Sequence, residues 1–545
     1  MEPRALETDY LVIGSGAAGM AFTDSLISET DAQVVMVDRG CAPGGHWNDA
    51  YPFVRLHQPA RFYGVNSTPL GSDAVEPRGP EAGQYERTRG SEIRAYYARV
   101  MEKRLIASGR VRFFPNCEYV DKHRFVSRVS GAAFDVKVRR KLVDANYLSP
   151  SIPALTPAPF GVADGVSVIP VHRLVDLVDK PERYVIVGAG KTALDACVWL
   201  LRNGVDPGDI QWLKPRETWL QNRSYTQPGE LVGILLDGIS LQMEAAAQAS
   251  SIDDLIDRLE AAAQMRRVDR SVRPTMYKGA TIGDWEIDLL RGIEDVIRLG
   301  HVRSIERDRI LLERGSVATS PRHLHVHCAA GLRYPPALPI FAADCITLQP
   351  VRMGLIPFNA ALVGFVEAHR DDDAEKNRLC PTNPFTNTPL DWACATLIQM
   401  GADRAWSKEP DLQAWLERSR LNPIRGLRVH ADEERCSGHH RDSPPTSGPA
   451  SSGSLRSLGR LQHRCAPRPS MNHTRFVGVR SAANIHSRDA SSAGRVQAWA
   501  HDRPRSARER QEGHSLAAAR ERCGTGGVDG ECQLRGAAAQ MDIPD

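Results

Sequence analysis

Short apolar runs near the N-terminus are separated by a stretch with helical periodicity. Leu11 to Ile13 are all apolar, and a second apolar run lies between Gln33 and Asp38. Uninterrupted runs of this length are typical of strands that are buried on both faces of a parallel sheet. Between the two runs, the apolar residues from Ala21 to Ile27 recur with the period of a helix. The pattern therefore predicts a strand–helix–strand unit.

The same succession returns in the middle of the chain. We expect a strand from Tyr184 to Val187, a helix from Leu194 to Leu201, and a second strand from Ile210 to Leu213. Two such units predict an α/β fold with two Rossmann-like, doubly wound domains. The Ala-rich, amphipathic stretch from Leu241 to Leu299 follows the second unit, so we expect a mostly helical insertion at about residues 229–300.

The turn after the first strand has the form G-x-G-x-x-G. Gly14 permits a tight turn, Gly16 lets a pyrophosphate approach the backbone at the start of the helix, and Gly19 allows close helix–strand packing. Asp38, at the tip of the second strand, stands where an acid binds the hydroxyl groups of a ribose. A glycine-rich turn without a ligand has no use for that acid. We therefore predict a dinucleotide site that comprises Gly14, Gly16, Ala17, Ala18, Gly19, Asp38 and Arg39.

The turn after the strand at Tyr184 reads G-A-G-K-T, which allows two interpretations. A phosphate-binding P-loop requires a glycine five positions before Gly190, but that position holds Val185, so this interpretation fails. A G-x-G-x-x-A dinucleotide turn remains. Lys214 and Arg216 follow the second strand in place of an acid. Such cations suit the 2′-phosphate of NADP, and the alternative is that they are solvated surface charges. The predicted second site comprises Gly188, Gly190, Lys191, Thr192, Ala193, Lys214 and Arg216.

The segment Gly44-G-H-Trp47 follows the first unit, and its two glycines allow the backbone to pass close to a large flat ligand. It resembles the G-G-x-W element of flavin-dependent monooxygenases. With two dinucleotide turns in one chain, residues 9–430 resemble the two-dinucleotide-binding flavoproteins, and among them the flavin-containing and Baeyer–Villiger monooxygenase group. The resemblance implies an FAD domain in two parts, residues 1–165 and 326–430, interrupted by an NADP domain at residues 166–325.

The resemblance also implies site residues outside the two turns. It places Ala330 and Gly331 at the return crossing between the domains, and Asn359 before a late helix, Ala360 to Ala368, whose N-terminus would face the flavin. A buried helix with an Asn cap gives the same pattern. His57 is a candidate catalytic proton donor or substrate contact, but a loop histidine is also compatible with simple exposure. The implied FAD contacts are Gly45, His46, Trp47, Gln58, Ala330, Gly331 and Asn359.

The implied function is a cytoplasmic, FAD-containing, NADPH-dependent oxidoreductase of the monooxygenase type. In such enzymes NADPH reduces the flavin, and O₂ then supplies one oxygen atom to a small organic substrate. The group's signature F-x-G-x-x-x-H is not found before the second turn, which weakens the assignment to a named reaction. Two alternatives therefore stay open: a flavin reductase that passes electrons from NAD(P)H to another acceptor, and a nucleotide-binding protein without catalytic activity.

The overall composition limits the partners and the compartment. The net charge of +3 is too small to indicate nucleic-acid binding, and no run approaches the ~18 consecutive apolar residues that a membrane span needs. The opening residues MEPRALETD lack the apolar centre of a secretory signal, which favours the cytoplasm. None of the 11 cysteines has C-x-x-C spacing, which disfavours a redox-active dithiol, and we expect no metal site.

The composition changes abruptly near residue 430. Between Ala431 and Asp545 there are 17 arginines and no lysine, and only 12 residues are Leu, Ile, Val or Phe. That apolar share is below the ~20% under which a chain rarely builds a packed core. An Arg-rich arm for nucleic acid is disfavoured because acidic residues are interleaved. We expect residues 431–545 to be a low-complexity, disordered tail.

Removal of residues 431–545 is therefore expected to leave folding and activity intact. The measurement compares the melting temperature and the NADPH oxidation rate of the full and truncated chains. An insoluble or inactive truncated protein would contradict this interpretation of the tail.

Overall fold

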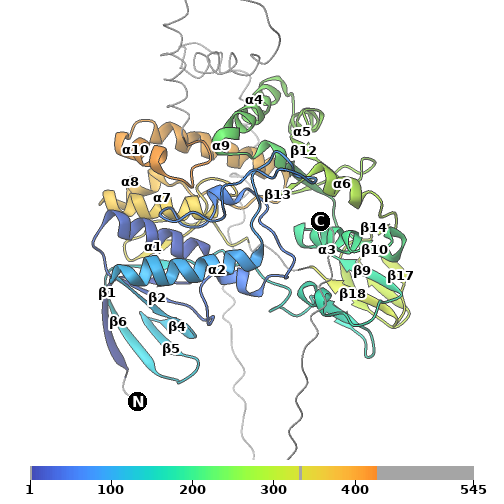
Figure 1. The fold of residues 1–545 in the computed structure, drawn as a ribbon, viewed down its shortest axis with the longest axis horizontal. Coiled ribbons are helices and arrows are strands. Elements are labelled where there is room, and N and C mark those ends of the chain that lie inside the picture. The colour runs from blue at the N-terminus through green and yellow to red at the C-terminus, as the bar shows by residue number, and fades with distance from the viewer. Residues whose placement is uncertain (1–2, 330–333, 426–545) are drawn as a thin grey trace, which may run out of the picture. The chain divides into compact units, whose positions relative to one another are not determined.

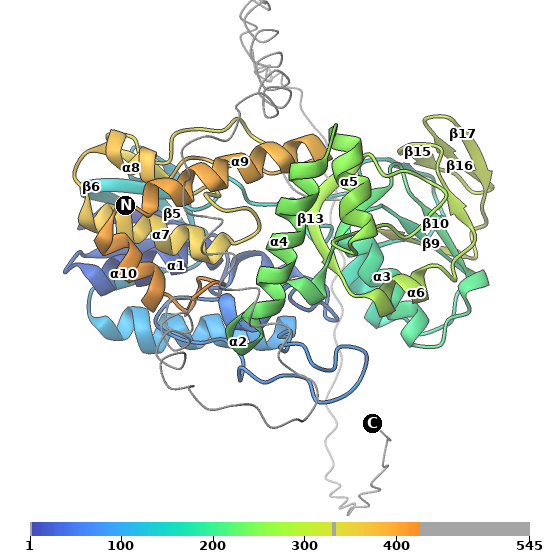
Figure 2. The same cartoon turned by 90° about the horizontal axis from the view of Figure 1, so that it is seen from above.

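The computed structural model describes residues 3–329 and 334–425, all of which belong to one compact unit, Met1–Ser470. The predicted tail at 431–545 and two predicted site residues, Ala330 and Gly331, lie outside the described residues. Within the described residues the protein is α/β, as the sequence predicts, with its strands in four sheets (Figures 1 and 2).

The first sheet contains the first glycine-rich turn. Its central strand β1 pairs in parallel with β2 and β6, while β4 and β5 extend the sheet beyond β6 in antiparallel pairing. The late strand β19 returns to this sheet beside β6. The strands, in spatial order, are β3 (Val111–Phe114), β2 (Val34–Val37), β1 (Arg4–Ile13), β6 (Ala133–Asp144), β5 (Arg124–Ser127) and β4 (Cys117–Asp121), with β19 (Cys345–Thr347) also on β6.

The second sheet contains the second glycine-rich turn, and all of its described strands are parallel. The middle strand β9 has no exposed residue, as expected for a strand covered on both faces. The strands, in spatial order, are β14 (Val296–Ile297), β10 (Ile210–Leu213), β9 (Arg183–Val187), β18 (His323–His327) and β8 (Val168–Pro170).

Two smaller sheets and ten helices complete the described part. The third sheet consists, in spatial order, of β12 (Met265–Arg266), β11 (Thr218–Asn222) and β13 (Met276–Ile282). The fourth consists of β17 (Gly315–Ala318), β16 (Arg309–Leu312), β15 (Val302–Ile305) and β7 (Gly161–Val162). The helices are α1 (Ala17–Glu29), α2 (Gly90–Val100), α3 (Lys191–Arg202), α4 (Val232–Gln248), α5 (Ile252–Ala261), α6 (Asp284–Leu290), α7 (Ile356–His369), α8 (Asp373–Leu379), α9 (Pro389–Trp406) and α10 (Pro410–Arg418).

Helices α1 and α7 pack directly against each other beside the first sheet (Figure 1). A β-carbon at Gly364 of α7 would lie 2.7 Å from the carbonyl oxygen of Phe22 in α1, so only glycine permits this approach. At the far end of α7, the Glu367 carboxylate accepts hydrogen bonds from the Tyr10 hydroxyl (2.9 Å) and from Lys376 (2.6 Å). The return of the chain after the second sheet is thereby fixed to the first strand.

The insertion differs from the sequence prediction. Helices α4 and α5 are present and lie side by side (Figure 2), but the second half of the insertion contains β12, β13 and β14. β13 forms because β11, which lies just after the second nucleotide-binding unit, offers it a parallel partner. Pairing of this kind depends on tertiary context, which local composition does not reveal.

The late helix also differs from its prediction. α7 begins at Ile356 rather than at Ala360, and its N-cap residue is Leu355, so Asn359 lies inside the first turn and is not a cap. Pro357 accounts for the earlier start, because proline is readily accommodated in the first turn of a helix.

Among the described residues, no helix combines the length and the apolar character that crossing a membrane would require.

Candidate functional site

The glycines of the first turn serve two different purposes. Gly14 has a φ of +106°, and a β-carbon at Gly19 would lie 2.1 Å from the carbonyl oxygen of Gly14. Both are therefore required by the packing of α1 against β1. Gly16 has an ordinary φ of −75°, and the closest neighbour of a β-carbon there would be the Cα of Gly45 at 3.6 Å. The packing of the protein alone does not require a glycine at Gly16, and the predicted approach of a pyrophosphate there stays a prediction.

The start of α1 has donors to offer such a ligand. No side chain caps this helix, so the backbone N–H groups of Ala17 and Ala18 receive no side-chain acceptor from the N-cap position. The N-terminus of a helix in this condition favours phosphate groups. The G-G-H-W segment is anchored at the same turn, because the N–H of Gly44 donates to the carbonyl oxygen of Ser15 (2.9 Å).

Asp38 holds the first turn to the end of β2. Its Oδ2 accepts hydrogen bonds from the N–H (2.6 Å) and the hydroxyl (2.7 Å) of Ser15, and its Oδ1 accepts one from the N–H of Gly40 (2.7 Å). A carboxylate oxygen can accept two hydrogen bonds, so Oδ1 retains capacity for a ribose hydroxyl. The neighbouring Arg39 is exposed. These bonds give Asp38 a structural use that the sequence did not suggest, so the acid does not by itself require a ligand; its position is compatible with the predicted ribose contact, which stays a prediction.

The other predicted FAD contacts after this turn differ in how firmly the protein holds their side chains. Trp47 is buried, and its indole N–H donates to the hydroxyl of Tyr63 (2.9 Å), so its ring is fixed by the protein. His46 is exposed to solvent, but the surrounding protein still desolvates its imidazole in part. This desolvation lowers its pKa to about 4, so the ring is neutral at pH 7. Gln58 is half-buried.

The side-chain oxygen and nitrogen of Asn359 each form one hydrogen bond with the backbone of Arg352, and the predicted flavin contact stays a prediction. Its side-chain oxygen accepts a hydrogen bond from the N–H of Arg352 (2.8 Å), and its side-chain N–H₂ donates to the carbonyl oxygen of the same residue (2.7 Å). The residue is buried. Its visible role is to hold the segment before α7 to the first turn of that helix.

The second turn repeats the geometry of the first. Gly188 has a φ of +140°, and a β-carbon there would approach the carbonyl oxygen of Cys328 to 3.1 Å. Gly190 has a φ of −84°, and no atom lies within 4 Å of the position of its missing β-carbon. The helix α3 that follows has no side-chain cap. Ala193 is fully buried against the strand, and Thr192 is partly exposed beside the open position.

The two lysines that were expected to lie beside NADP are already engaged with carboxylates. The ammonium group of Lys191 is bonded to Asp195 and lies 3.4 Å from Oε1 of Glu286. Lys214 is only 2% exposed, and its Nζ lies 2.5 Å from Oε2 of Glu217. The interpretation of Lys214 as a solvated surface charge is therefore wrong.

The contact of Lys214 and Arg216 with a 2′-phosphate stays a prediction, and the structure adds further cations beside them. Arg216 is half-buried and donates to the side-chain oxygen of Asn387 (3.0 Å). A cavity of about 630 Å³ adjoins Lys214, and Arg270, Arg291 and Arg298 also line it. These three arginines belong to the insertion, and none of them lies in a recognisable sequence motif.

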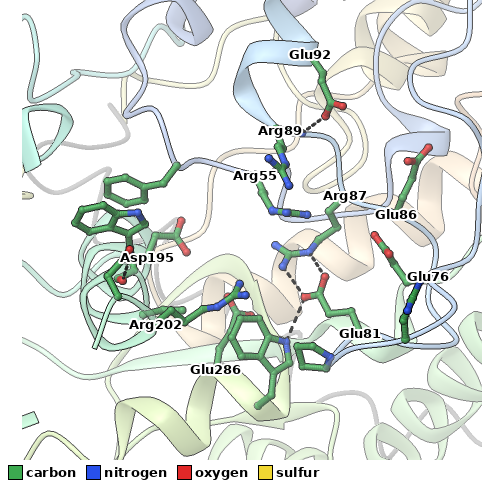
Figure 3. A pocket seen from close by; sticks show the side chains of 17 residues that line it. Arg55, Glu76, Glu81, Glu86, Arg87, Arg89, Glu92, Asp195, Arg202 and Glu286 are labelled. Carbon is green, nitrogen blue, oxygen red and sulfur yellow. Dashed lines mark hydrogen bonds and ion pairs between the residues drawn. The ribbon is translucent and has the colours of Figure 1, made fainter. Parts of the chain in front are cut away.

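A buried chain of alternating charges connects the second turn to two other segments, and Figure 3 shows four of its members, Asp195, Glu286, Glu81 and Arg87. From Lys191 it continues through Glu286 of α6 to Arg223, whose guanidinium lies 2.5 Å from Glu286 and 2.6 Å from Glu81. Glu81 in turn is paired with Arg87 (2.5 Å). With Asp195 at its other end, the network holds three carboxylates and three cations, which is the condition under which buried charges are stable.

The cations dominate the acid–base behaviour of this network. Burial by itself raises the pKa of Glu286, but the charges of Lys191, Arg223 and Arg87 outweigh it, so that the pKa of this carboxyl is held well below its usual range. Glu286 also accepts the N–H of Gly283 (2.7 Å). It is therefore ionised throughout the physiological pH range.

Loop residues 51–57 join the same network. The Tyr51 hydroxyl donates to Oδ2 of Asp195 (2.6 Å), and Nε2 of His57 lies 3.9 Å from the same oxygen. The carbonyl oxygen of His57 accepts hydrogen bonds from Thr281 (2.5 Å) and Arg223 (3.2 Å). The loop is thus fixed by the helix of the second turn and by the insertion.

His57 is neutral in this position. Desolvation and the nearby charge of Lys191 lower its pKa to about 3, although Asp195 acts in the opposite direction. Its side chain remains 40% exposed, so water offsets part of this shift. A neutral imidazole can still donate one hydrogen bond and accept another, so the predicted substrate contact stays possible, whereas donation of a proton from a resident imidazolium is disfavoured.

The sequence pointed to only part of this site. Lys191 and His57 were singled out, and Asp195 was foreseeable because residues four positions apart share a helix face. No sequence pattern identifies the other members of the network, because their partners are distant in the sequence and belong to segments without a motif. These members are Glu286, Arg223, Glu81 and Arg87.

Comparisons with known proteins give close relatives and distant structural neighbours. No protein-family model matches the chain. The proteins Mb2023 of Mycobacterium bovis and Rv2000 of Mycobacterium tuberculosis, both described as uncharacterized, are each 46% identical to it over 426 residues, which is 78% of this chain and 79% of theirs.

The solved structures that are similar include the flavoprotein group that the motifs resemble. A cyclohexanone monooxygenase is 13% identical and has a TM-score of 0.42, with 80% of this chain and 99% of that chain covered. A steroid monooxygenase bound to NADP is 12% identical (TM-score 0.41; 66% and 85% covered), and a flavin-containing monooxygenase from Stenotrophomonas maltophilia is 14% identical (TM-score 0.36; 65% and 88% covered).

Substitution of the second glycine of each turn is expected to separate the two nucleotide sites. Gly16→Ala and Gly190→Ala each cost about 1 kcal/mol of stability, because alanine is a poorer N-cap than glycine. Gly16→Ala is expected to lower the FAD content of the purified protein, and Gly190→Ala to weaken NADPH binding at least tenfold. Each variant is the control for the other. Loss of the same nucleotide in both variants would contradict the assignment of two sites.

Replacement of the central carboxylate is expected to destabilise the protein strongly. Glu286→Gln removes the carboxylate that Arg223 and Lys191 share and leaves three cations with two carboxylates, which costs about 3–5 kcal/mol. Because the pKa of Glu286 is lowered on folding, its contribution is complete above about pH 4.5 and declines as the pH falls below that value.

The difference between the native chain and Glu286→Gln should therefore shrink by about 1 kcal/mol between pH 7 and pH 4. Urea unfolding at both pH values measures it. The exposed Glu102 supplies the control Glu102→Gln, for which we expect a change within about 0.5 kcal/mol. A pH-independent or negligible effect of Glu286→Gln would show that the network does not hold the site together.

Proposed function

The chain belongs to the same family as the mycobacterial proteins Mb2023 and Rv2000, and we propose that it is an FAD-containing, NADPH-dependent oxidoreductase of the monooxygenase type. One observation carries the proposal. Two separate sheets each present, after a parallel strand, a glycine-rich turn whose second glycine is left open by the protein and is followed by a helix without a side-chain cap. A protein that bound a single nucleotide would need this arrangement only once.

The first turn suits FAD. Gly16 and the start of α1 would receive the pyrophosphate, Asp38 would bind the ribose, and the adjacent G-G-H-W segment would follow the flavin. The second turn suits NADPH, with its pyrophosphate at Gly190 and the start of α3. When bound, this pair of cofactors supplies hydride transfer and the activation of O₂.

The residues of the chain would orient the nucleotides and control access to them. The network of Lys191, Glu286 and Arg223 holds the start of α3 in place, so that the second turn is formed before the nucleotide binds. His57 and Tyr51, tied to the same helix through Asp195, would position a substrate through neutral hydrogen bonds. A substrate contact of this kind is supported by the partial exposure of His57.

The runner-up function is an NAD(P)H-dependent flavin reductase that delivers electrons to a quinone or another acceptor. The missing F-x-G-x-x-x-H signature favours it, because that element belongs to the oxygenating enzymes of the resembled group. Both functions share the cofactors and the direction of hydride flow. They differ in the fate of O₂.

Isotope transfer is expected to decide between these two functions. The FAD-loaded protein receives NADPH, ¹⁸O₂ and model ketone and sulfide substrates, and the products are analysed by mass spectrometry. A monooxygenase incorporates one ¹⁸O atom into the organic product for each NADPH that is productively used. Rapid NADPH-dependent reduction of a quinone under nitrogen, together with unlabelled organic compounds under ¹⁸O₂, would favour the reductase instead.

A further inference from the structure

A cavity of about 580 Å³ lies beside the buried charge network, and one side of it carries unpaired positive charge. Figure 3 shows Arg55, Arg87 and Arg89 close together there. Arg87 is neutralised by Glu81. The guanidinium groups of Arg55 and Arg89 form no ion pair or side-chain hydrogen bond with any residue in the described ranges 3–329 and 334–425.

The two unpaired arginines are placed against each other. Arg55 and Arg89 face one another in an isolated antiparallel bridge, and like charges directly opposite in such a pair are destabilising. Arg55 is also half-buried. Partial burial, and after it the charges of Arg89 and Arg87, lowers the pKa of Arg55 below its ordinary value, but a guanidinium stays charged in proteins. The repulsion between these two cations lowers the stability of the folded protein, and neither Arg55 nor Arg89 has an ion pair among the described residues that would compensate for it.

The acidic residues of the cavity form no ion pair with Arg55 or Arg89, although the charges of Glu81 and Glu76 partly offset the lowering of the Arg55 pKa. Glu92 accepts the backbone N–H of Arg89 (2.9 Å), and Glu86 accepts hydrogen bonds from the backbone and the hydroxyl of Ser72. Glu76 also lines the cavity and forms no ion pair with Arg55. Arg55 and Arg89 therefore line the cavity without an ion pair among the described residues.

The rest of the lining is partly aromatic. Phe53 stacks on Trp199 with ring centroids 4.9 Å apart, and both rings are half-buried at the cavity. Trp285 lines it as well. The volume lies within the range of about 300–1,000 Å³ that is typical of small-molecule sites, and such sites combine an apolar wall with a few convergent polar groups.

We propose that this cavity binds a small organic acid, with its carboxylate between Arg55 and Arg89 and its apolar part against Phe53 and Trp199. Arginine recognises carboxylates through paired N–H donors, which would relieve the repulsion between the two guanidinium groups. The inference goes beyond the proposed function and does not depend on it, because neither the flavin nor the nicotinamide takes part in this recognition.

Calorimetric titration of the purified full chain tests the site without turnover. The probes are benzoate, phenylacetate and 3-phenylpropionate, each compared with its neutral amide at low ionic strength. At least one acid is expected to bind ten times more tightly than its amide. Arg55→Met is expected to weaken the binding of that acid at least tenfold, and Arg55→Lys is expected to retain only part of the original affinity.

Two controls separate recognition from folding and from nucleotide binding. Arg94→Met removes an exposed arginine of α2 outside the cavity and should leave the acid's affinity unchanged. Arg55→Met should not lower the melting temperature, because it removes a like-charge repulsion, and it should leave NADPH affinity unchanged. Equal binding of acids and amides, or no binding of either, would overturn the proposal. It would also be overturned if inorganic phosphate bound in place of the acids, or if Arg55→Met weakened the binding of NADPH rather than that of the acid.

Discussion

The mutual neutralisation of buried charges is the constraint on which the rest of the site depends. Glu286 and Arg223 are 3% and 1% exposed, so each depends on the opposite charges around it to remain ionised at an acceptable cost. Because their partners come from α3, from the loop before α2 and from the insertion, one network fixes three segments that are distant in the sequence. The second turn, loop 51–57 and the adjoining cavity all take their positions from it.

The two turns show how close packing and ligand approach are divided among glycines. Gly14, Gly19 and Gly188 are required by the backbone conformation or by contacts within the protein. Gly16 and Gly190 have ordinary conformations and no close neighbour beyond van der Waals contact, so packing does not explain the missing side chain. This difference separates a nucleotide-binding turn from a glycine-rich turn of purely structural origin.

The sequence predicted those features that depend on local order and missed those that depend on tertiary pairing. The strands before each turn, the helices after them and the open glycines follow from short patterns, and the structure contains them. Strands β12 and β13 of the insertion pair with β11, β14 pairs with β10, and Asn359 is engaged by Arg352; no local pattern reveals these contacts. Lys191 and Lys214 were recognised as cations, but their carboxylate partners become apparent only in the folded chain.

The central claim is that two nucleotide sites in one chain exchange a hydride. Its most direct test is the absorption spectrum of the FAD-loaded protein during anaerobic titration with NADPH and, separately, with NADH. The account predicts loss of the oxidised flavin band on addition of NADPH, with NADH less effective. A flavin that stays oxidised in the presence of either nucleotide would contradict it, because the second site would then bind no functional electron donor.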